Sequence, residues 1–230
     1  MYVWRQSMSD ITAVVTGSTS GIGKAVADML ERRGMTVIRA DRSVADLRDI
    51  DSITKAYGQI AKTHKPAILV NAAGCAYYGL HENISPKQIK EMCDVNLTSP
   101  LIITNLLLPS IRQQKGLIVN ISSVSAVNVN THGAAYGATK AGLDSFGRSL
   151  WAEVRKHGVR VVNIRPDMTR TDLYRNADFE ASSDAGAALD PEDVADAVES
   201  ILDLKEGKVI TEMTITPQYM KIHKKSRTDI

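Results

Sequence analysis

The period of the hydrophobic positions changes repeatedly along this chain. Short runs of β-branched and aliphatic residues, typical of buried strands, alternate with longer segments in which apolar residues recur every three or four positions, as on one face of a helix. The runs predict about seven strands, at residues 13–16, 36–40, 45–47, 67–70, 117–121, 159–164 and 209–215. Strands that alternate with helices form βαβ units, so we expect a parallel sheet with helices on both faces.

The segments between the strands carry residues that begin and end helices. Ser85 and Ser99 each precede a proline, the arrangement of an N-cap residue before a proline at the first helical position. A long helical pattern runs from about residue 134 to residue 157, where Gly158 can end it. Asp190 stands before the proline that opens the last predicted helix.

The whole pattern predicts one Rossmann-type domain over residues 1–230, an α/β protein with a doubly wound parallel sheet and its core at residues 10–217. A chain of 230 residues with 43% hydrophobic residues can bury such a core without disulfide bonds. Residues 167–189 are polar and rich in alanine and serine, so we expect a lid over the substrate. The basic segment 221–230 is predicted to be a flexible tail or a loose subunit arm.

Composition narrows the classes of partner and compartment. The 28 basic and 26 acidic residues give a net charge of +2, which offers no electrostatic reason for a nucleic acid or membrane partner. The two cysteines, Cys75 and Cys93, have no metal-ligand spacing to histidine, so we expect free thiols, a reducing compartment and no metal site. The opening residues lack the apolar core of a signal peptide, and the run at 101–108 is too short to span a bilayer; a cytoplasmic protein is expected.

A glycine-rich turn follows the first predicted strand and opens a helix. Its sequence, TGSTSGIG, places Gly17, Gly21 and Gly23 where a backbone turns tightly and approaches a pyrophosphate bound at the helix N-terminus. The spacing G-x-x-x-G-x-G differs from the general dinucleotide fingerprint G-x-G-x-x-G. A purely structural turn is therefore the alternative interpretation.

Asp41 ends the second predicted strand, where a carboxylate can accept hydrogen bonds from the ribose of adenosine. The same charge repels a 2′-phosphate, which favours NAD as the cofactor. Arg42 follows directly and can instead bind that phosphate, so NADP is the alternative. Asp41 can also be a simple turn carboxylate.

Tyr136 and Lys140 stand one helical turn apart and share a face of the long helix. A free phenol has a pKa near 10, so lowering it by about three units requires roughly 4 kcal/mol of favourable interaction with the phenolate. A nearby lysine and the positive ring of an oxidised nicotinamide both act in that direction. Tyr136 can then exchange a proton with a substrate oxygen while hydride moves to or from the nicotinamide. Taken alone, a Tyr/Lys pair at this spacing is common and is better explained by a solvated helix face.

Five separated elements, taken in order and spacing, resemble the short-chain dehydrogenase/reductase family over about residues 10–217: 16–23, 71–74, Asn96, Ser122-Ser123 and 136–140. The resemblance implies that Tyr136 is the general acid/base, that Ser123 rather than Ser122 binds the substrate oxygen, and that Lys140 binds the nicotinamide ribose. It implies that Asn96 holds a water in a proton relay to Lys140. With the three glycines, Asp41, Tyr136 and Lys140, the implied cofactor contacts are Ser20, Ile22, Arg42, Asp46, Leu47, Asn71, Ala72, Ala73, Gly74, Pro166, Met168, Thr169 and Thr171.

Two regions depart from the family pattern. Asp167 and Thr169 stand where the family segment P-G-x-V-x-T has glycine and valine, although Thr171 is retained. The aspartate adds a negative charge beside the expected cofactor. Only about a dozen residues separate Asp41 from the next helical pattern, so the third strand must be very short, and the usual helix before it is reduced or missing.

The function that follows is an NAD(P)-dependent oxidoreductase that interconverts a secondary alcohol and a ketone. The ending VITEMTITP at residues 209–217 resembles family members that act on 3-hydroxy acids or 3-oxoacyl compounds. A dinucleotide-binding sensor without turnover and a dehydratase or epimerase on the same scaffold are the alternatives. The sensor is disfavoured because Asn96, Ser123, Tyr136 and Lys140 are all present.

Two further expectations concern the substrate and the assembly. Arg165, Arg170 and Arg175 can bind a carboxylate or phosphate of the substrate, or can be solvated or paired with aspartates nearby in the lid. The long helix has apolar residues on more than one side, and together with the helix at 101–108 it resembles the family's four-helix interface. A homodimer or homotetramer is therefore expected.

Overall fold

Six parallel strands lie at the centre of the protein, whose computed structural model describes residues 7–225. In the order β2-β1-β3-β4-β5-β7 they are Thr36–Ala40, Thr12–Thr16, Ile68–Asn71, Leu117–Ile121, Arg160–Pro166 and Glu212–Ile215. The chain runs outward from β1 in both directions, so the strand order reverses between β1 and β3. In open sheets of this kind, ligands bind beyond the carboxyl ends of the strands at the reversal.

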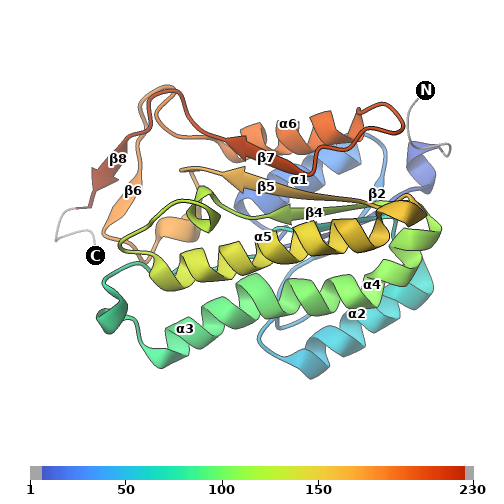
Figure 1. Ribbon diagram of the computed structural model, residues 1–230, viewed down its shortest axis with the longest axis horizontal. Helices are drawn as coiled ribbons and strands as arrows, with labels where there is room; N and C mark the ends of the chain where they lie inside the picture. Colours follow the sequence, from blue (N-terminus) through green and yellow to red (C-terminus); the bar gives the residue numbers. More distant parts are fainter. Residues whose placement is uncertain (1–6, 226–230) are drawn as a thin grey trace.

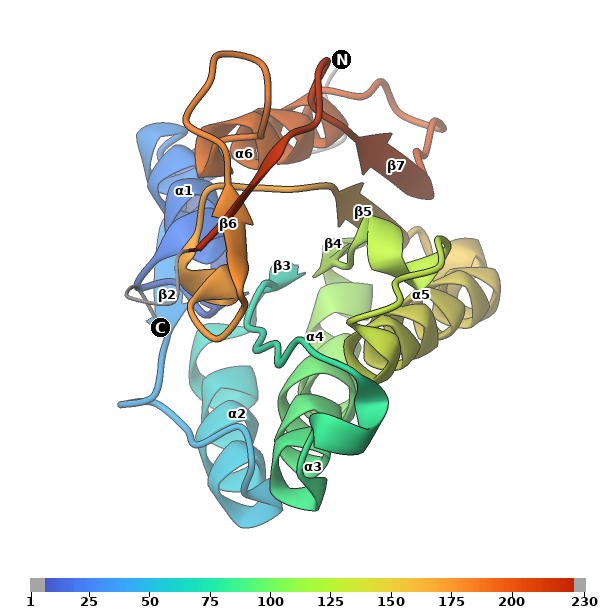
Figure 2. The same cartoon turned by 90° about the vertical axis from the view of Figure 1, so that its left-hand side faces the viewer.

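Helices cover both faces of this sheet (Figures 1 and 2). On one face, α1 (Gly21–Arg32) and α6 (Pro191–Leu202) bury a cluster with the strands that includes Val26, Leu30 and Val198. On the other face, α2 (Ile50–His64), α4 (Ser99–Gln113) and α5 (Ala134–Val154) bury a second cluster. The four inner strands, β1, β3, β4 and β5, are almost fully buried, which explains their largely apolar runs, whereas the edge strands β2 and β7 are partly exposed.

Shorter elements complete the chain. Helix α3 (Pro86–Cys93) leads into α4 through the π-helix η3 (Asp94–Thr98), and β6 (Phe179–Ala181) pairs antiparallel with β8 (Ile222–Lys224). The 3-10 helices are η1 (Met8–Asp10), η2 (His81–Asn83), η4 (Val124–Ala126), η5 (Arg155–His157) and η6 (Asp172–Tyr174). Within residues 7–225, no helix combines the length and the apolar character that a membrane span requires.

Most of the predicted helix boundaries are confirmed. Ser85 caps α3 through a reciprocal capping box with Gln88, and Pro86 follows it at the first position. A second capping box, at Asp190, begins α6. Gly158 ends the long helical segment at a φ of +80°, a conformation that favours glycine.

The strand predicted at residues 45–47 is wrong, and the parallel sheet has six strands instead of about seven. The backbone N–H groups of Val44 and Ala45 both donate to the carbonyl oxygen of Asp41, which closes a turn. Asp49 then caps α2 by accepting a hydrogen bond from the Asp51 N–H. Ala45 and Leu47 face the core from this loop, so their apolar character imitated a strand.

Two other expectations need correction. Ser99 is not an N-cap, because α3, the π-helix and α4 form one continuous helical path in which the Ser99 hydroxyl donates to the carbonyl oxygen of Val95, 2.9 Å away. The segment predicted to be a flexible tail contributes strand β8, which pairs with β6 of the expected lid. Residues 226–230 of that segment lie outside the described residues.

Candidate active site

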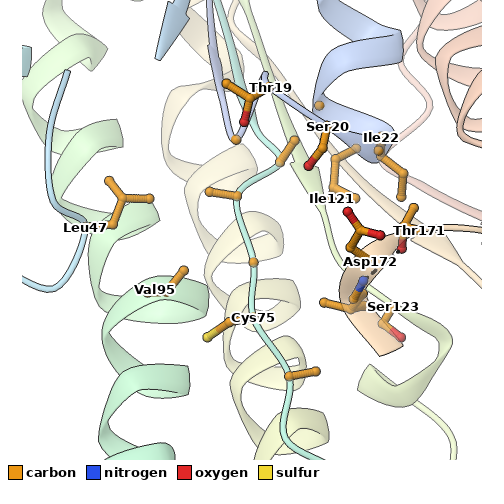
Figure 3. A pocket seen from close by; sticks show the side chains of 18 of the residues that line it. Thr19, Ser20, Ile22, Leu47, Cys75, Val95, Ile121, Ser123, Thr171 and Asp172 are labelled. Atoms are coloured by element: carbon orange, nitrogen blue, oxygen red, sulfur yellow. Dashed lines mark hydrogen bonds between the residues drawn. The ribbon is translucent and has the colours of Figure 1, made fainter. Parts of the chain in front are cut away.

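A cavity of about 280 Å³ opens at the carboxyl ends of the central strands, where their order reverses. In Figure 3, Leu47, Val95 and Cys75 lie on one side of it, and Ile22, Ser123 and Thr171 lie on the other. The structure brings most of the predicted site residues to its wall: Gly17, Ser20, Gly21, Ile22, Gly23, Asp41, Arg42, Asp46, Leu47, Ala72, Ala73, Gly74, Ser123, Tyr136, Lys140, Pro166, Thr169 and Thr171.

Three predicted residues lie outside the wall. Asn71 and Asn96 are buried behind it, with 3% and 0% of their surfaces exposed. Met168 is partly exposed and does not line the cavity. The geometry therefore does not favour direct contact between a bound cofactor and the side chains of these three residues.

The glycine turn packs too closely for side chains. A Cβ atom on Gly17 would lie 2.7 Å from the Cα atom of Ala73, and one on Gly23 would lie 2.3 Å from the Gly17 carbonyl oxygen. Gly17 also has a φ of +66°, and its N–H donates to the carbonyl oxygen of Ala40. The side chain of Thr16 accepts from the N–H groups of Ala72 and Ala73, each at 3.0 Å, and so ties this turn to the segment after β3.

The N-terminus of α1 faces the cavity with unpaired donors. Ser20 is the N-cap residue but its side chain makes no capping hydrogen bond, and the first N–H groups of a helix have no acceptor within the helix. Gly21, Ile22 and Gly23 line the cavity at this point. The glycine turn and the N-terminus of α1 together form a cradle, which we call the glycine cradle, that has no room for added Cβ atoms. Such a cradle fits the pyrophosphate of a dinucleotide.

Gly17→Ala tests the glycine cradle, with Gly34→Ala as the matched control. Both glycines have positive φ, so each alanine costs about 1–2 kcal/mol of stability from the left-handed backbone alone. Nothing lies within 4 Å of a Cβ atom on Gly34, whereas Gly17 meets Ala73. We expect dinucleotide affinity, measured by calorimetric titration, to fall about tenfold or more only for Gly17→Ala, a change of about 1.4 kcal/mol. Equal affinity of the two variants would contradict the cradle.

Charged residues line the part of the cavity where the adenosine of a dinucleotide is expected. Asp41 follows β2 and accepts hydrogen bonds from the N–H and hydroxyl of Ser43, which lower the pKa of Asp41. Hydrogen bonds from Arg48 lower the pKa of Asp46 to about 2. Both carboxylates are therefore ionised at neutral pH. Arg42, which directly follows Asp41 in the sequence, lines the same cavity.

Tyr136, Ser123 and Lys140 meet at the other end of the cavity. Tyr136 and Lys140 project from α5 one turn apart, with the Lys140 Nζ atom 5.8 Å from the centre of the Tyr136 ring. Lys140 Nζ donates to the carbonyl oxygen of Ile121, 2.9 Å away. Ser123 is hydrogen bonded to Tyr136, whereas the Ser122 hydroxyl donates to the backbone carbonyl of Lys140. Of the two serines, Ser123 is thus the one beside the phenol.

The pKa values of this pair depart from the expectation drawn from the sequence. Burial raises the pKa of Tyr136, and the hydrogen bond to Ser123 acts against this rise. Burial lowers the pKa of Lys140 to about 8, while the charges of Cys75 and Asp144 act against that shift. The expected lowering of the Tyr136 pKa by Lys140 is not found in the protein alone, where desolvation dominates.

Asn96 lies in the π-helix directly behind the cavity wall. Its side chain accepts from the N–H of Cys75 and donates to the Cys75 carbonyl oxygen, at 2.9 and 2.8 Å, and also donates to Thr139. A Cβ atom on Gly74 would be 3.5 Å from Asn96 Oδ1 and 3.7 Å from Lys140 Nζ. Asn96 therefore fixes the segment after β3 beside Lys140, and π-helical turns of this kind are frequent at functional sites.

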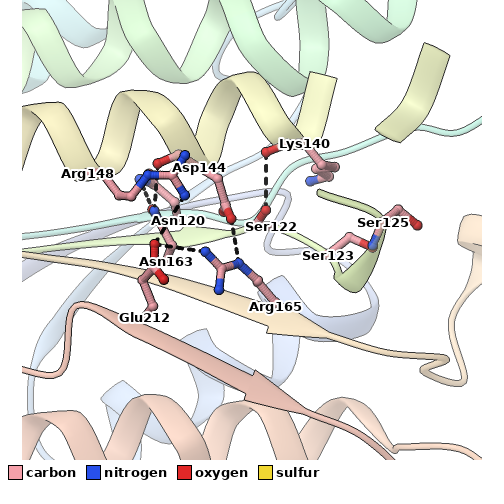
Figure 4. Close-up of polar contacts among 10 residues, drawn as sticks. All are labelled: Asn120, Ser122, Ser123, Ser125, Lys140, Asp144, Arg148, Asn163, Arg165 and Glu212. Atoms are coloured by element: carbon pink, nitrogen blue, oxygen red, sulfur yellow. Dashed lines mark hydrogen bonds and ion pairs between the residues drawn. The ribbon is translucent and has the colours of Figure 1, made fainter. Parts of the chain in front are cut away.

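A row of buried polar side chains crosses the sheet beside α5 (Figure 4). Asn71, Asn120 and Asn163 lie opposite one another on β3, β4 and β5, and each is hydrogen bonded to the next. Asn163 donates to the backbone carbonyl of Asp144, whose carboxylate accepts from the buried Arg165. Arg165 also pairs with Glu212 on β7. This network joins α5, which carries Tyr136 and Lys140, to four strands.

Several residues of the wall carried no sequence signal of their own. Glu91 and Val95 both line the cavity and stand four residues apart on one helix face. This spacing is a signal from which their shared position in the wall could have been predicted. The others depend on how the loops fold back: Thr19, Ala40, Ala45, Arg48, Cys75, Ala76, Ile121, Asp172, Leu173 and Tyr174. Ser122, Asp167 and Arg175 also line the wall and were already named from the sequence. Within residues 7–225, no three histidine, cysteine or acidic side chains come together to hold a metal ion.

The reversed strand order, the glycine turn and the cavity between them define a Rossmann-type fold of the dinucleotide-binding class. The sequence profile described as short chain dehydrogenase matches residues 41–181. An uncharacterized oxidoreductase of Staphylococcus saprophyticus is 31% identical, with 91% of this chain and 98% of the relative covered. Serine 3-dehydrogenase of Agrobacterium fabrum is 35% identical, with 75% of this chain and 78% of the relative covered. The chain belongs to the short-chain dehydrogenase family.

Solved structures agree with this assignment. A metagenomic short-chain oxidoreductase in complex with NADP is 29% identical and has a TM-score of 0.78, covering 93% of this chain and 100% of that chain. A 3-ketoacyl-(acyl-carrier-protein) reductase from Brucella melitensis complexed with NADH has a TM-score of 0.81 at 23% identity, covering 93% and 99%. The second likeness shows the fold alone. The predicted family and α/β fold are confirmed.

Proposed function

We propose that this protein is an NAD(P)-dependent oxidoreductase that interconverts a secondary alcohol and a ketone, with Tyr136 as its general acid/base. The observation that carries the proposal is the meeting of Tyr136, Ser123 and Lys140 in the cavity whose other end is the glycine turn. Its family relatives include oxidoreductases and a serine 3-dehydrogenase, which supports the same reaction class.

A nicotinamide cofactor, when bound, supplies the acceptor or donor of the hydride. The chain's own residues handle the proton. Ser123 donates a hydrogen bond to the substrate oxygen, and the Tyr136 hydroxyl oxygen exchanges a proton with it. Lys140, held by the carbonyl of Ile121, supplies a positive charge that favours the tyrosinate when the proton has left. Asn96 keeps Gly74 and Cys75 in place beside Lys140, and a water between Asn96 and Lys140 is part of the proposed proton relay.

The test is a panel of secondary alcohols and ketones assayed with both cofactors, followed by the absorbance of the reduced nicotinamide. Turnover of any panel member supports the proposal. Dinucleotide binding by calorimetry with no turnover across the panel would instead support the dinucleotide-binding sensor. No binding at millimolar dinucleotide would contradict both.

We also propose NAD as the preferred cofactor, because Asp41 is ionised and lines the cavity at the end of β2. We expect NAD to bind at least about tenfold more tightly than NADP, a difference of about 1.4 kcal/mol. Asp41→Ala should narrow that ratio because it removes the charge that repels a 2′-phosphate, while Asp51→Ala, on α2, should not. Calorimetric titrations with both dinucleotides measure the ratio; tighter binding of NADP by the unchanged protein, through Arg42, would contradict the proposal.

The remaining proposals concern assembly and location. A homodimer or homotetramer formed through α4 and α5 is supported by partly buried apolar residues on these helices, among them Ile102, Phe146 and Trp151. Sedimentation velocity tests this assembly. One cofactor-binding domain at residues 10–217 and a cytoplasmic location are proposed together, since Cys75 and Cys93 are both free thiols.

A further inference from the structure

Three arginines lie near the lid, and the structure separates them by what they contact. Arg165 is buried and pairs with Asp144 and Glu212. Arg170 donates to the carboxylate of Asp190 at 2.9 Å and to two backbone carbonyls of the lid. Both guanidinium groups therefore hold the fold together and are not available to a ligand.

Arg175 differs from both. It is exposed, it lines the cavity, and it forms no ion pair with any carboxylate among residues 7–225. Asp172 and Asp178, its acidic neighbours in the sequence, do not pair with it in the described chain. Within residues 7–225, the guanidinium group of Arg175 therefore lies in the cavity wall without a carboxylate partner.

The backbone around Arg175 is held by the C-terminal strand. The Lys225 Nζ atom donates to the carbonyl oxygen of Tyr174 at 2.9 Å and to that of Arg175 at 3.5 Å, and the Lys225 N–H donates to Asp178. The ring of Tyr174 stacks on Tyr78 with centroids 5.9 Å apart. These contacts fix the position from which the Arg175 side chain reaches the cavity.

The charge of Arg175 acts on Cys75 and Tyr77, in the segment after β3. Burial raises the pKa of Cys75 to about 11, and the charges of Lys140, Arg175 and Arg42 all act against this rise. The hydrogen bond to Glu91 raises the pKa of Tyr77, and Arg175 acts against that shift as well. Arg175 and Lys140 therefore influence the same segment after β3, next to the place proposed for the substrate. Glu91, one of five acidic residues that line the cavity, is engaged by Tyr77 and Arg48.

We propose that Arg175 binds an anionic group of the substrate, a carboxylate, and thereby selects hydroxy acids over neutral alcohols. The inference rests on the proposed function, because it assumes that the substrate hydroxyl lies at Tyr136. A guanidinium group with free donors binds a carboxylate in a bidentate manner, and loss of such a contact weakens binding by about 100-fold. A phosphate would meet the same donors, so the experiment separates the two anions.

The probes are 3-hydroxybutanoate, its neutral amide and 3-hydroxybutyl phosphate, each titrated calorimetrically into the NAD-loaded protein and assayed for oxidation. The wild type should bind the carboxylate most tightly. Arg175→Gln should raise the Kd and KM for 3-hydroxybutanoate about 100-fold and leave the amide unchanged, while Arg175→Lys should restore part of the loss. Arg112→Gln, an exposed arginine at the end of α4, is the control and should change nothing.

The outcomes separate this inference from the proposed function. Oxidation of the amide as efficiently as the acid would support the oxidoreductase but overturn the role of Arg175. Tightest binding of the phosphate ester would overturn the carboxylate, and a weaker Kd for NAD in Arg175→Gln would assign Arg175 to the cofactor and overturn the inference. Carboxylate binding that depends on Arg175 without any turnover would support the inference while the proposed function fails.

Discussion

Replacing Tyr136 by phenylalanine is expected to lower kcat by about 1,000-fold and to leave the Kd of the dinucleotide within about twofold. A positioned general acid/base contributes about 10²–10⁴ to a rate, and phenylalanine removes only the hydroxyl that exchanges the proton. The ring itself is buried, at 3% exposure, and packs 5.8 Å from the ring of Tyr78, so the cavity wall keeps its shape. Steady-state assays on an active alcohol, together with calorimetric titration of the dinucleotide, measure both quantities.

Tyr78→Phe is the matched control for this experiment. Tyr78 belongs to the same aromatic cluster, with Tyr174 and Phe179 against it, but its hydroxyl has no part in the proposed proton transfer. Its kcat should stay within about threefold of the wild type, since only packing around the site is altered slightly. If Tyr136→Phe retains full activity, or if both variants lose activity equally, Tyr136 is not the group that exchanges the proton.

The elements of this fold whose positions depend on local chemistry could be predicted from the sequence. Strand β2 and strand β4 begin and end at the predicted residues. The central strand β4 is buried throughout and needs a largely apolar run, while the edge strand β2 keeps β-branched residues in a partly exposed run. The glycine turn and the i, i+4 pair of Tyr136 and Lys140 were also predicted, since each depends on neighbours within one turn of backbone.

The features that could not be predicted depend on contacts between distant parts of the chain. Ala45 is buried by α2 and β2 although its backbone forms a turn, so apolar character alone did not distinguish loop from strand. Strand β8 exists only because β6, more than 40 residues earlier, offers it a partner. Arg175 was a candidate from the sequence, but only the fold distinguishes it from Arg165 and Arg170, which form ion pairs.

The proton chemistry also shows a limit of reasoning from spacing. Spacing places an ammonium group near a phenol and predicts a lowered phenol pKa, but it does not show that α5 buries both groups against β4 and β5. Desolvation penalises the charged forms of Tyr136 and Lys140 alike. Under the proposed function, the bound cofactor and substrate therefore have to contribute to stabilising the tyrosinate.

Asp144→Ala is expected to produce the largest loss of stability, about 3–5 kcal/mol in the free energy of unfolding. Asp144 is 1% exposed and Arg165 is 8% exposed, so removing the carboxylate leaves a buried guanidinium with only Glu212 as its anionic partner. For a chain of this size each kcal/mol corresponds to about 2–4 °C, so Tm should fall by roughly 10 °C or more. Urea unfolding followed by circular dichroism measures the free energy.

Two further variants show whether the loss comes from the buried charge. Arg148→Ala removes an exposed guanidinium 3.3 Å from Glu212 and should cost less than about 1 kcal/mol, because exposed ion pairs contribute little. Asp144→Leu combined with Arg165→Met replaces the buried pair by apolar groups and should recover most of the stability that Asp144→Ala loses. A double variant no more stable than Asp144→Ala would mean that the network matters through its hydrogen bonds to α5, and not through the cost of a buried guanidinium that has lost one of its two carboxylate partners.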